Sequence, residues 1–211
     1  MRFTTIFFDL DDTLYPSHAG LWRAIKERMN DYMRERLHIP EKDIPRLREK
    51  YYMTYGTTMR GLQKHHHVNT EDFLAYAHDL PLADYLTPDS IQRSVIASLP
   101  TRNVIFTNAD IHHARRVLTA LNLDGLFENI VDVNAVAPYC KPMRESFGIA
   151  MKIAGETDSA RCVMIDDLPR TTRAAREAGM FSILYHDAWT PGDADAHFTD
   201  WNDLVKILES N

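Results

Sequence analysis

A short apolar run that ends in carboxylates places the tightest limit on how this chain can fold. Ile6, Phe7 and Phe8 are consecutive apolar residues without the alternation of a half-exposed strand, and Asp9 and Asp11 follow at once. Such a run is typical of a strand buried on both faces of a parallel sheet. Like charges this close repel each other, and burying them is costly unless a cation accompanies them. The stretch therefore predicts a central strand whose carboxyl end holds a site, as in open α/β sheets.

The length and composition are those of an ordinary globular protein with one core domain. Of the 211 residues, 45% are hydrophobic and 26% are charged. The formal net charge of −6 argues against a nucleic-acid partner, because such proteins usually carry a basic face. Cys140 and Cys162 lack the spacing of a metal knuckle or a CxxC pair, so both are predicted to be reduced thiols. We see no signal segment and no apolar run of transmembrane length, so we expect a cytoplasmic protein without a membrane partner.

Residues 17–87 carry helical patterns and no pattern of a buried strand. Apolar residues spaced three and four apart between Leu21 and Leu37 predict a long amphipathic helix that follows a cap at Ser17. Three further helices are predicted, at residues 42–55, 57–65 and 70–78. We interpret this block as a helical cap domain inserted into an α/β core. The predicted core domain consists of residues 1–16 and 88–211.

Beyond the insert, predicted strands alternate with predicted helices. The strands are predicted at residues 104–106, 130–133, 162–165 and 181–184. The helices are predicted at residues 90–99, 111–121, 143–154, 171–178 and 201–208. Residues 187–198 are predicted to form a surface loop. This alternation implies right-handed crossovers, so the predicted fold class is α/β, a Rossmann-like parallel sheet with helices on both faces.

Polar residues follow four of the predicted strands, where parallel strands share one edge of the sheet. Besides Asp9 and Asp11, these residues are Thr107, Asn108, Lys141, Asp166 and Asp167. Taken singly, each is explained as well or better by a helix cap, a turn or a solvated side chain. Their joint occurrence at strand ends, in this order, favours one convergent site.

The residue types at these strand ends suit phosphoryl transfer. The Asp9 carboxylate can attack phosphorus and form an aspartyl-phosphate, while a second carboxyl, Asp11, moves the proton. Carboxylate oxygens of Asp9 and Asp166 make the hard oxygen site that Mg²⁺ prefers. The Thr107 hydroxyl can donate to phosphate oxygens, and Lys141 supplies a positive charge.

Four short motifs carry a family resemblance. They are Asp9-Leu-Asp11-Asp-Thr13, Thr107-Asn108, Lys141-Pro142 and Ile165-Asp166-Asp167. In this order they resemble the motifs of the haloacid dehalogenase superfamily of phosphohydrolases, and the helical insert lies where that family places its type 1 cap. The resemblance implies a nucleophilic Asp9 and an acid/base Asp11, with Lys141, Thr107 and Asn108 on the phosphate. The metal ligands it implies are Asp9, Asp11 through its backbone carbonyl, Asp166 and Asp167.

Two details refine this resemblance. The dehalogenases of the superfamily lack the second carboxylate, so Asp11 indicates a phosphatase or phosphomutase. The chain departs from the family pattern at Leu168-Pro169-Arg170-Thr171, where family members often have Ser and a later Asn or Asp. That departure changes the side chains that could form hydrogen bonds to the metal ligands and orient them.

The insert carries a second resemblance. Its residues are Tyr51-Tyr52-Met-Thr-Tyr55-Gly56-Thr-Thr-Met-Arg60-Gly61-Leu62, Val68-Asn69 and Leu80-Pro81-Leu82, together with Leu14-Tyr15 in the core. They resemble pyrimidine 5′-nucleotidases of fungal and bacterial type, which implies hydrolysis of UMP or CMP. Tyr52 and Tyr55 could stack on the base, and Arg60 could bond a carbonyl or the phosphate. The tyrosines could equally pack the core of the insert.

The expected protein is a Mg²⁺-dependent phosphomonoesterase for pyrimidine nucleoside monophosphates, monomeric or homodimeric. One alternative is a phosphatase or mutase for another small phosphate ester, such as a sugar phosphate or phosphoglycolate. A second alternative is a ligand-binding protein without catalysis. The histidine runs 65–67 and 112–113 are predicted to be solvated parts of helices rather than metal sites.

Overall fold

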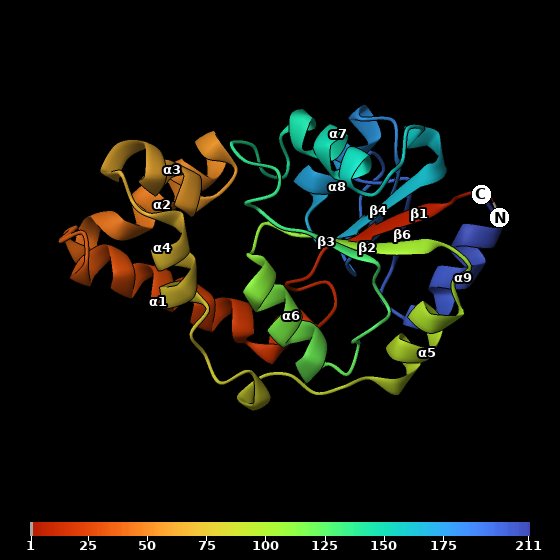
Figure 1. Cartoon of the computed structure of the whole chain (residues 1–211), viewed down its shortest axis with the longest axis horizontal. Coiled ribbons are helices and arrows are strands. Elements are labelled where there is room, and N and C mark those ends of the chain that lie inside the picture. Colours follow the sequence, from red (N-terminus) through yellow and green to blue (C-terminus); the bar gives the residue numbers. More distant parts are fainter. Residues whose placement is uncertain (1) are drawn as a thin grey trace. The chain divides into compact units, whose positions relative to one another are not determined.

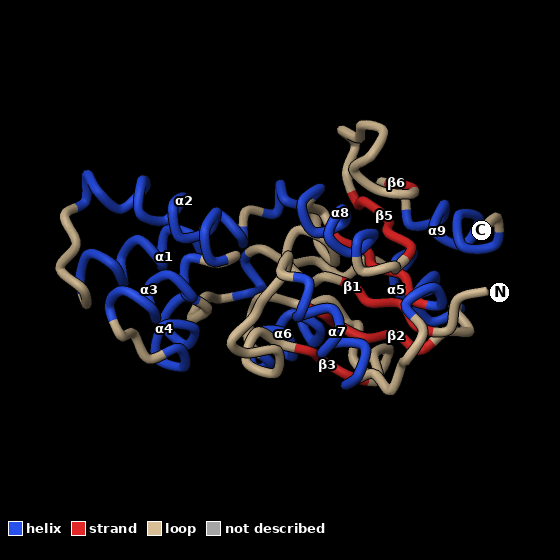
Figure 2. The backbone as a smooth tube through the Cα atoms, turned by 90° about the horizontal axis from the view of Figure 1, so that it is seen from above, coloured by secondary structure: helices blue, strands red, loops and turns tan. Residues whose placement is uncertain are grey.

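A computed structural model describes residues 2–211 and divides them into two compact units. The sheet unit contains the residues up to Pro16 together with Leu86–Asn211, and the helical unit contains Ser17–Tyr85. All strands of the described residues belong to the sheet unit, while the helical unit has only helices and connecting loops (Figure 2). Within the same range, no helix combines the length and apolar character needed to cross a bilayer.

The sheet unit is organised around six parallel strands in the described part of the chain. They are β1 (Thr5–Phe8), β2 (Arg102–Phe106), β3 (Asn129–Val131), β4 (Cys162–Asp166), β5 (Phe181–Tyr185) and β6 (Ala196–Phe198). Their order across the sheet is β3-β2-β1-β4-β5-β6, and every neighbouring pair is parallel. The chain therefore runs outward from β1 through β2 and β3, then returns to β4 on the other side of β1. This reversal makes the carboxyl ends of β1 and β4 the switch point where open α/β sheets bind ligands.

Nine α-helices fall within residues 2–211. Those of the helical unit are α1 (Leu21–Glu35), α2 (Ile44–Tyr55), α3 (Thr58–His66) and α4 (Thr70–Ala77). Those of the sheet unit are α5 (Ser90–Ser98), α6 (Ile111–Ala120), α7 (Arg144–Ile153), α8 (Pro169–Glu177) and α9 (Trp201–Glu209). The predicted cap at Ser17 is wrong, because Ser17–Ala19 form a 3₁₀ turn and α1 follows Gly20, whose φ is 84°.

The helices of the sheet unit cover both faces of the sheet. Helices α7 and α8 lie on one side, and α5 and α9 lie on the other (Figure 1). Phe7 and Phe106 pack with Phe147 of α7, whereas the buried Asn103 amide donates to the Ile96 carbonyl of α5. The predicted fold class is confirmed, including the helical insertion after the first strand. The predicted loop at 187–198 is partly wrong, since its last three residues form β6 and pair with β5.

The helical unit has its own buried core and its own caps. Tyr32 packs edge-on against Phe73 at 5.1 Å, and its hydroxyl donates to the Asp72 carboxylate at 2.6 Å. A Cβ added at Gly61 would lie 2.2 Å from Cγ of Tyr51, so α2 and α3 approach closely at this point. The Tyr51 ring is therefore part of the packing of this unit.

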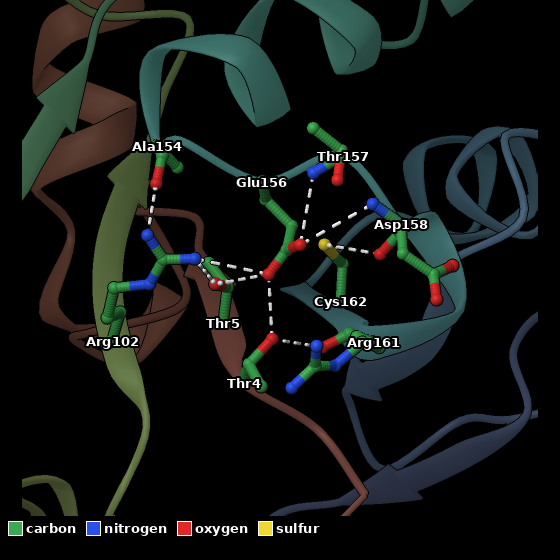
Figure 3. Close-up of polar contacts among 9 residues, drawn as sticks. All are labelled: Thr4, Thr5, Arg102, Ala154, Glu156, Thr157, Asp158, Arg161 and Cys162. Atoms are coloured by element: carbon green, nitrogen blue, oxygen red, sulfur yellow. Dashed lines mark hydrogen bonds and ion pairs between the residues drawn. The ribbon is translucent and has the colours of Figure 1, made fainter.

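One buried carboxylate joins the amino ends of the central strands. Oε2 of Glu156 accepts hydrogen bonds from Thr4 Oγ1 at 2.7 Å, Thr5 Oγ1 at 3.2 Å and Arg102 Nη2 at 3.1 Å (Figure 3). Oε1 accepts from the two following backbone N–H groups, the first of which belongs to Thr157. The Thr4 hydroxyl and these N–H groups lower the pKa of Glu156 to about 2. This cluster ties β1 and β2 to the segment that leads into β4.

Candidate active site

Three carboxylates and one lysine meet at the carboxyl edge of the sheet. Asp9 directly follows β1, Asp166 is the last residue of β4, and Asp167 comes next. The Lys141 ammonium lies 2.7 Å from Asp9 Oδ1 and 2.7 Å from Asp166 Oδ2. Carboxylate oxygens of Asp9, Asp166 and Asp167 lie within 4.8 Å of one another. The structure thus brings together four of the residues that the sequence singled out.

Backbone hydrogen bonds fix the two strand ends that carry these carboxylates. The Asp9 N–H donates to the Ile165 carbonyl at 2.9 Å, which extends the pairing of β1 with β4 by one residue. The Leu168 N–H donates to Asp166 Oδ1 at 3.0 Å. Leu168 stands where related sequences often have Ser, and its backbone supplies a bond that orients Asp166. The departure from the family pattern therefore does not leave the Asp166 carboxylate without an orienting bond.

The electrostatic balance of this cluster is unfavourable for two of its carboxylates. The pKa of Asp9 rises to about 7. Burial of the carboxylate is the main cause, and together with the neighbouring Asp166 it outweighs the attraction of Lys141. Burial, reinforced by Asp166 and Asp9, raises the pKa of Asp167 to about 9. Burial alone would lower the pKa of Lys141, but Asp166 and Asp9 reverse this effect and raise it. The cluster therefore holds more negative charge than one ammonium group neutralises.

This donor set fits a magnesium ion. The three carboxylates offer hard oxygen ligands, and Mg²⁺ is usually held by one or two carboxylates, water and substrate phosphate. A divalent cation would also offset the charge that Lys141 leaves uncompensated. The carboxylate of Asp11 lies outside this group of three, so its predicted contribution to a metal site rests on its backbone carbonyl and stays a prediction.

The Asp11 carboxylate has two partners within the sheet unit. The Tyr15 hydroxyl donates to Asp11 Oδ1 at 2.7 Å, and Nε2 of His113 lies 2.9 Å from the same oxygen. Burial, with Asp11 next in importance, raises the pKa of Tyr15 well above its usual range. His113 was predicted to be solvated, and this is wrong because the side chain is buried at the start of α6. Of this pair, His112 is exposed and matches that prediction.

The two residues that follow β2 hold the loop of Lys141 and the turn that precedes α6. The Asn108 side chain bonds both backbone groups of Lys141, accepting from its N–H at 2.9 Å and donating to its carbonyl at 3.0 Å. The buried Thr107 hydroxyl oxygen accepts from the Ala109 N–H at 3.0 Å. In this bond the Thr107 hydroxyl is the acceptor, so the bond does not use its hydrogen. Asn108 thus positions the lysine, and the predicted contacts of both residues with phosphate stay predictions.

The three predicted substrate contacts of the insert all belong to the helical unit. Tyr52 is half-buried on α2, and the Tyr55 hydroxyl lies 2.7 Å from Nε2 of His65. Arg60 is buried on α3, where its guanidinium donates to the Gln63 side chain at 3.1 Å. Their contacts with a nucleotide remain a prediction. His65 and His67 are exposed, as predicted for a solvated helix end, and the expectation that this run holds no metal stays a prediction.

Comparison with known protein families identifies the class of hydrolase to which this fold and site belong. A family model described as haloacid dehalogenase-like hydrolase matches residues 3–179, and the chain belongs to this family. The family resemblance that the four sequence motifs indicated is thereby confirmed.

Individual relatives add detail. The chain is 29% identical over 195 residues to Phosphate metabolism protein 8 of Saccharomyces cerevisiae, an alignment that covers 85% of this chain and 60% of the yeast protein. A 2-haloacid dehalogenase from Pseudomonas syringae pv. Tomato and a predicted phosphoglycolate phosphatase from Haemophilus somnus have the same fold. Each superposes with a TM-score of 0.63 at 18% identity, over 99% of both chains. Because these two structures differ in activity, the fold alone leaves the reaction open.

Proposed function

We propose that this hydrolase is a Mg²⁺-dependent phosphomonoesterase that works through an aspartyl-phosphate on Asp9. The observation that carries the proposal is the Lys141 ammonium, held at 2.7 Å from both Asp9 and Asp166, with Asp167 beside them. A nucleophile, a cation and further carboxylates at one sheet edge are what phosphoryl transfer requires. The name of the yeast relative, which refers to phosphate metabolism, agrees with this chemistry.

The reaction is proposed to proceed in two balanced steps. In the first, an oxygen of the Asp9 carboxylate attacks phosphorus, the bond from phosphorus to the ester oxygen breaks, and Asp11 gives its proton to the departing alcohol. In the second, Asp11 takes a proton from water as the water oxygen attacks phosphorus, which releases Asp9 and phosphate. Throughout, the Lys141 ammonium offsets the repulsion between Asp9 and the phosphate oxygens.

The cation would be held by the carboxylates of Asp9, Asp166 and Asp167, with the backbone carbonyl of Asp11 as the further ligand implied by the family resemblance. When bound, Mg²⁺ supplies positive charge that lowers the repulsion between substrate and nucleophile. Asp11 favours a phosphatase over a dehalogenase, because hydrolysis of a phosphate ester needs a group that protonates the alcohol. This choice rests on the residue and its motif rather than on the shared fold.

Pyrimidine nucleoside 5′-monophosphates, UMP or CMP, are the proposed substrates. The support is the resemblance of the insert to the cap of pyrimidine 5′-nucleotidases, with Tyr52 and Tyr55 for the base and Arg60 for a carbonyl or the phosphate. Closure of such a cap would exclude bulk water from the reaction. Another small phosphate ester is the main alternative, because the core residues would act on any monoester that the helical unit admits.

A panel of esters tests the proposal. Phosphate release is measured from UMP, CMP, AMP, glucose phosphates and phosphoglycolate, with Mg²⁺ and after treatment with EDTA. We expect turnover that is fastest with UMP or CMP, abolished by EDTA and restored by added Mg²⁺. Faster turnover of a sugar phosphate or phosphoglycolate would overturn the assignment of the substrate but would leave the proposed mechanism unchanged. Turnover that survives removal of the metal would overturn the mechanism, and saturable binding without turnover would favour a ligand-binding protein.

A further inference from the structure

Two donors from distant parts of the chain converge on one oxygen of Asp11. Tyr15 follows four residues later in the loop after β1, whereas His113 comes from the first turn of α6. The Tyr15 hydroxyl lies 2.7 Å from Asp11 Oδ1, and the His113 Nε2 atom lies 2.9 Å from it. Only 2% of Tyr15 and 1% of His113 is exposed, so solvent competes little for either bond.

The chemistry of the three groups sets the direction of both bonds. A carboxylate can only accept hydrogen bonds, so His113 must carry a hydrogen on Nε2 when Asp11 is ionised, and the phenol donates as well. An oxygen that already accepts two hydrogen bonds is a poor place for a proton. The two donors therefore direct the acidic proton of Asp11 to the other oxygen, Oδ2, and stabilise the carboxylate that remains after the proton leaves.

The surroundings keep His113 in this position. The carboxylate of Asp110 accepts the backbone N–H groups of His112 and His113 at 2.8 and 3.0 Å and so caps α6. Asp132 accepts the N–H of Ile111 at 3.1 Å, which fixes the same helix end to the segment after β3. The start of α6 is therefore anchored independently of Asp11, as a support for a proton-transfer group requires.

We propose that Tyr15 and His113 are positioning residues that hold the Asp11 carboxyl in the orientation from which it protonates the leaving alcohol. The proposal rests on the proposed function, because it gives these residues a part in that reaction. Asp11 follows Asp9 by two residues in the loop after β1, and the like charges of the two carboxylates repel each other. Without the two donors, this repulsion would favour rotation of the carboxyl away from the reacting group. Neither residue touches the substrate in this role.

The leaving group provides the test, because an acidic phenol departs without help whereas an alkoxide must be protonated. The ester p-nitrophenyl phosphate is compared with the alkyl phosphate of the panel that the wild-type protein hydrolyses fastest. The ratio kcat/KM is measured for both, since it reports the steps up to departure of the alcohol. The variants are Tyr15→Phe, which keeps the ring, His113→Leu, and His113→Gln, which restores an N–H donor at similar reach.

We expect Tyr15→Phe to lower kcat/KM for the alkyl ester about tenfold and His113→Leu to lower it about a hundredfold, since loss of one positioning bond removes only part of the roughly 10²–10⁴-fold that general acid catalysis contributes. For the aryl ester the loss should stay below about threefold, and His113→Gln should recover part of the loss on the alkyl ester. Two matched controls should leave both esters unchanged. Tyr32→Phe removes a similar buried bond to an aspartate in the helical unit, and His112→Leu changes the exposed neighbour of His113.

Equal losses on both esters would overturn the proposal, since they would indicate a purely structural role, and so would the absence of any loss. If His113→Leu lacks the circular dichroism and cooperative melting of the wild-type protein, Tyr15→Phe decides by itself. Failure of the proposed function appears elsewhere, in the wild-type protein, as the absence of phosphate release from every ester. That outcome would remove the reaction and the positioning role together.

Discussion

The two ends of the same sheet both bury carboxylates, but they treat the charge in opposite ways. At the amino end, Glu156 accepts hydrogen bonds from two hydroxyl groups, a guanidinium and two backbone N–H groups, and its pKa falls to about 2. At the carboxyl end, three carboxylates share one ammonium, and the pKa values of Asp9 and Asp167 rise to about 7 and about 9.

This difference separates stability from function within one domain. A carboxylate with a lowered pKa stabilises the folded state at neutral pH, whereas one with a raised pKa destabilises it. The amino end is therefore complete without a ligand. The carboxyl end gains stability only when a cation or a proton arrives, as is common where binding sites are built at the expense of stability. Substitutions at the two ends should consequently move activity and stability in different directions.

The largest effect is expected from Asp9→Asn. Loss of the nucleophile should lower kcat by at least about 10⁴-fold, while the melting temperature stays unchanged or rises because one of the repelling charges is gone. Lys141 keeps Asp166 as its partner in this variant. Phosphate release and a thermal melt on the same sample check both parts. Substantial residual turnover would remove Asp9 from its assigned role, and a large drop in melting temperature would break the contrast between the two ends.

Asp167→Asn tests the same contrast in the metal-free protein. Its pKa is about 9 in the folded state against 3.8 for an ordinary aspartate, so the folded state retains a proton that the unfolded state has lost. The wild-type protein should therefore lose stability as pH rises from about 4 to about 9. At pH 8 in EDTA, Asp167→Asn should be more stable by about 1–3 kcal/mol.

Urea unfolding across this pH range measures the difference, and added Mg²⁺ should reverse it because the wild-type protein binds the ion more tightly. A variant that is less stable than the wild-type protein in EDTA at pH 8 would contradict the charge imbalance inferred at this edge.

The smallest effect on activity, with a clear effect on stability, is expected from Glu156→Gln. The folded-state pKa of about 2 lies below the ordinary 4.5, so the contribution of Glu156 is fully present above pH 4.5 and is lost as pH falls toward 2. At pH 7 the free energy of unfolding of the variant should be about 2 kcal/mol lower than that of the wild-type protein, and kcat should change less than about twofold.

The exposed Glu128→Gln is the matched control and should leave both quantities unchanged. Denaturant unfolding at pH 7 and pH 3 tests the linkage, because the deficit of the Glu156 variant should shrink in acid. A large fall in kcat with unchanged stability would show that the two ends are not separate in function.

Much of the fold could be predicted because the strongest patterns lie in its centre. The run from Ile6 to Phe8 has no alternation, and the structure buries it completely at the middle of the sheet. Strand β6 was missed because three residues at a sheet edge, with one exposed position, are too few to give a periodic signal. The convergence of Asp9, Lys141 and Asp166 followed from topology, since parallel strands end at a shared edge.

The partners of individual side chains could not be predicted in the same way. His113 follows another histidine at the start of an amphipathic helix, and the residue type alone does not distinguish the exposed member from the buried one. Its contact with Asp11 joins residues 102 positions apart, so only the tertiary structure reveals it. Likewise, an Asn after a strand is commonly a cap, and the use of Asn108 to hold the Lys141 backbone depends on a distant loop. A helical phase that placed His113 on the buried side was the one available signal.

The central place of β1 has a consequence for how the protein is made. Thr5 pairs with Arg102 on one side and with Cys162 on the other, so both neighbours of this strand are synthesised long after it. At the usual pace of translation, the apolar strand waits on the order of ten seconds for its second neighbour. During that interval an unpaired strand is prone to aggregate, whereas the helical unit, encoded directly after it, can already fold on local contacts. Nascent chains released before β4 should therefore depend on chaperones, while longer ones should not.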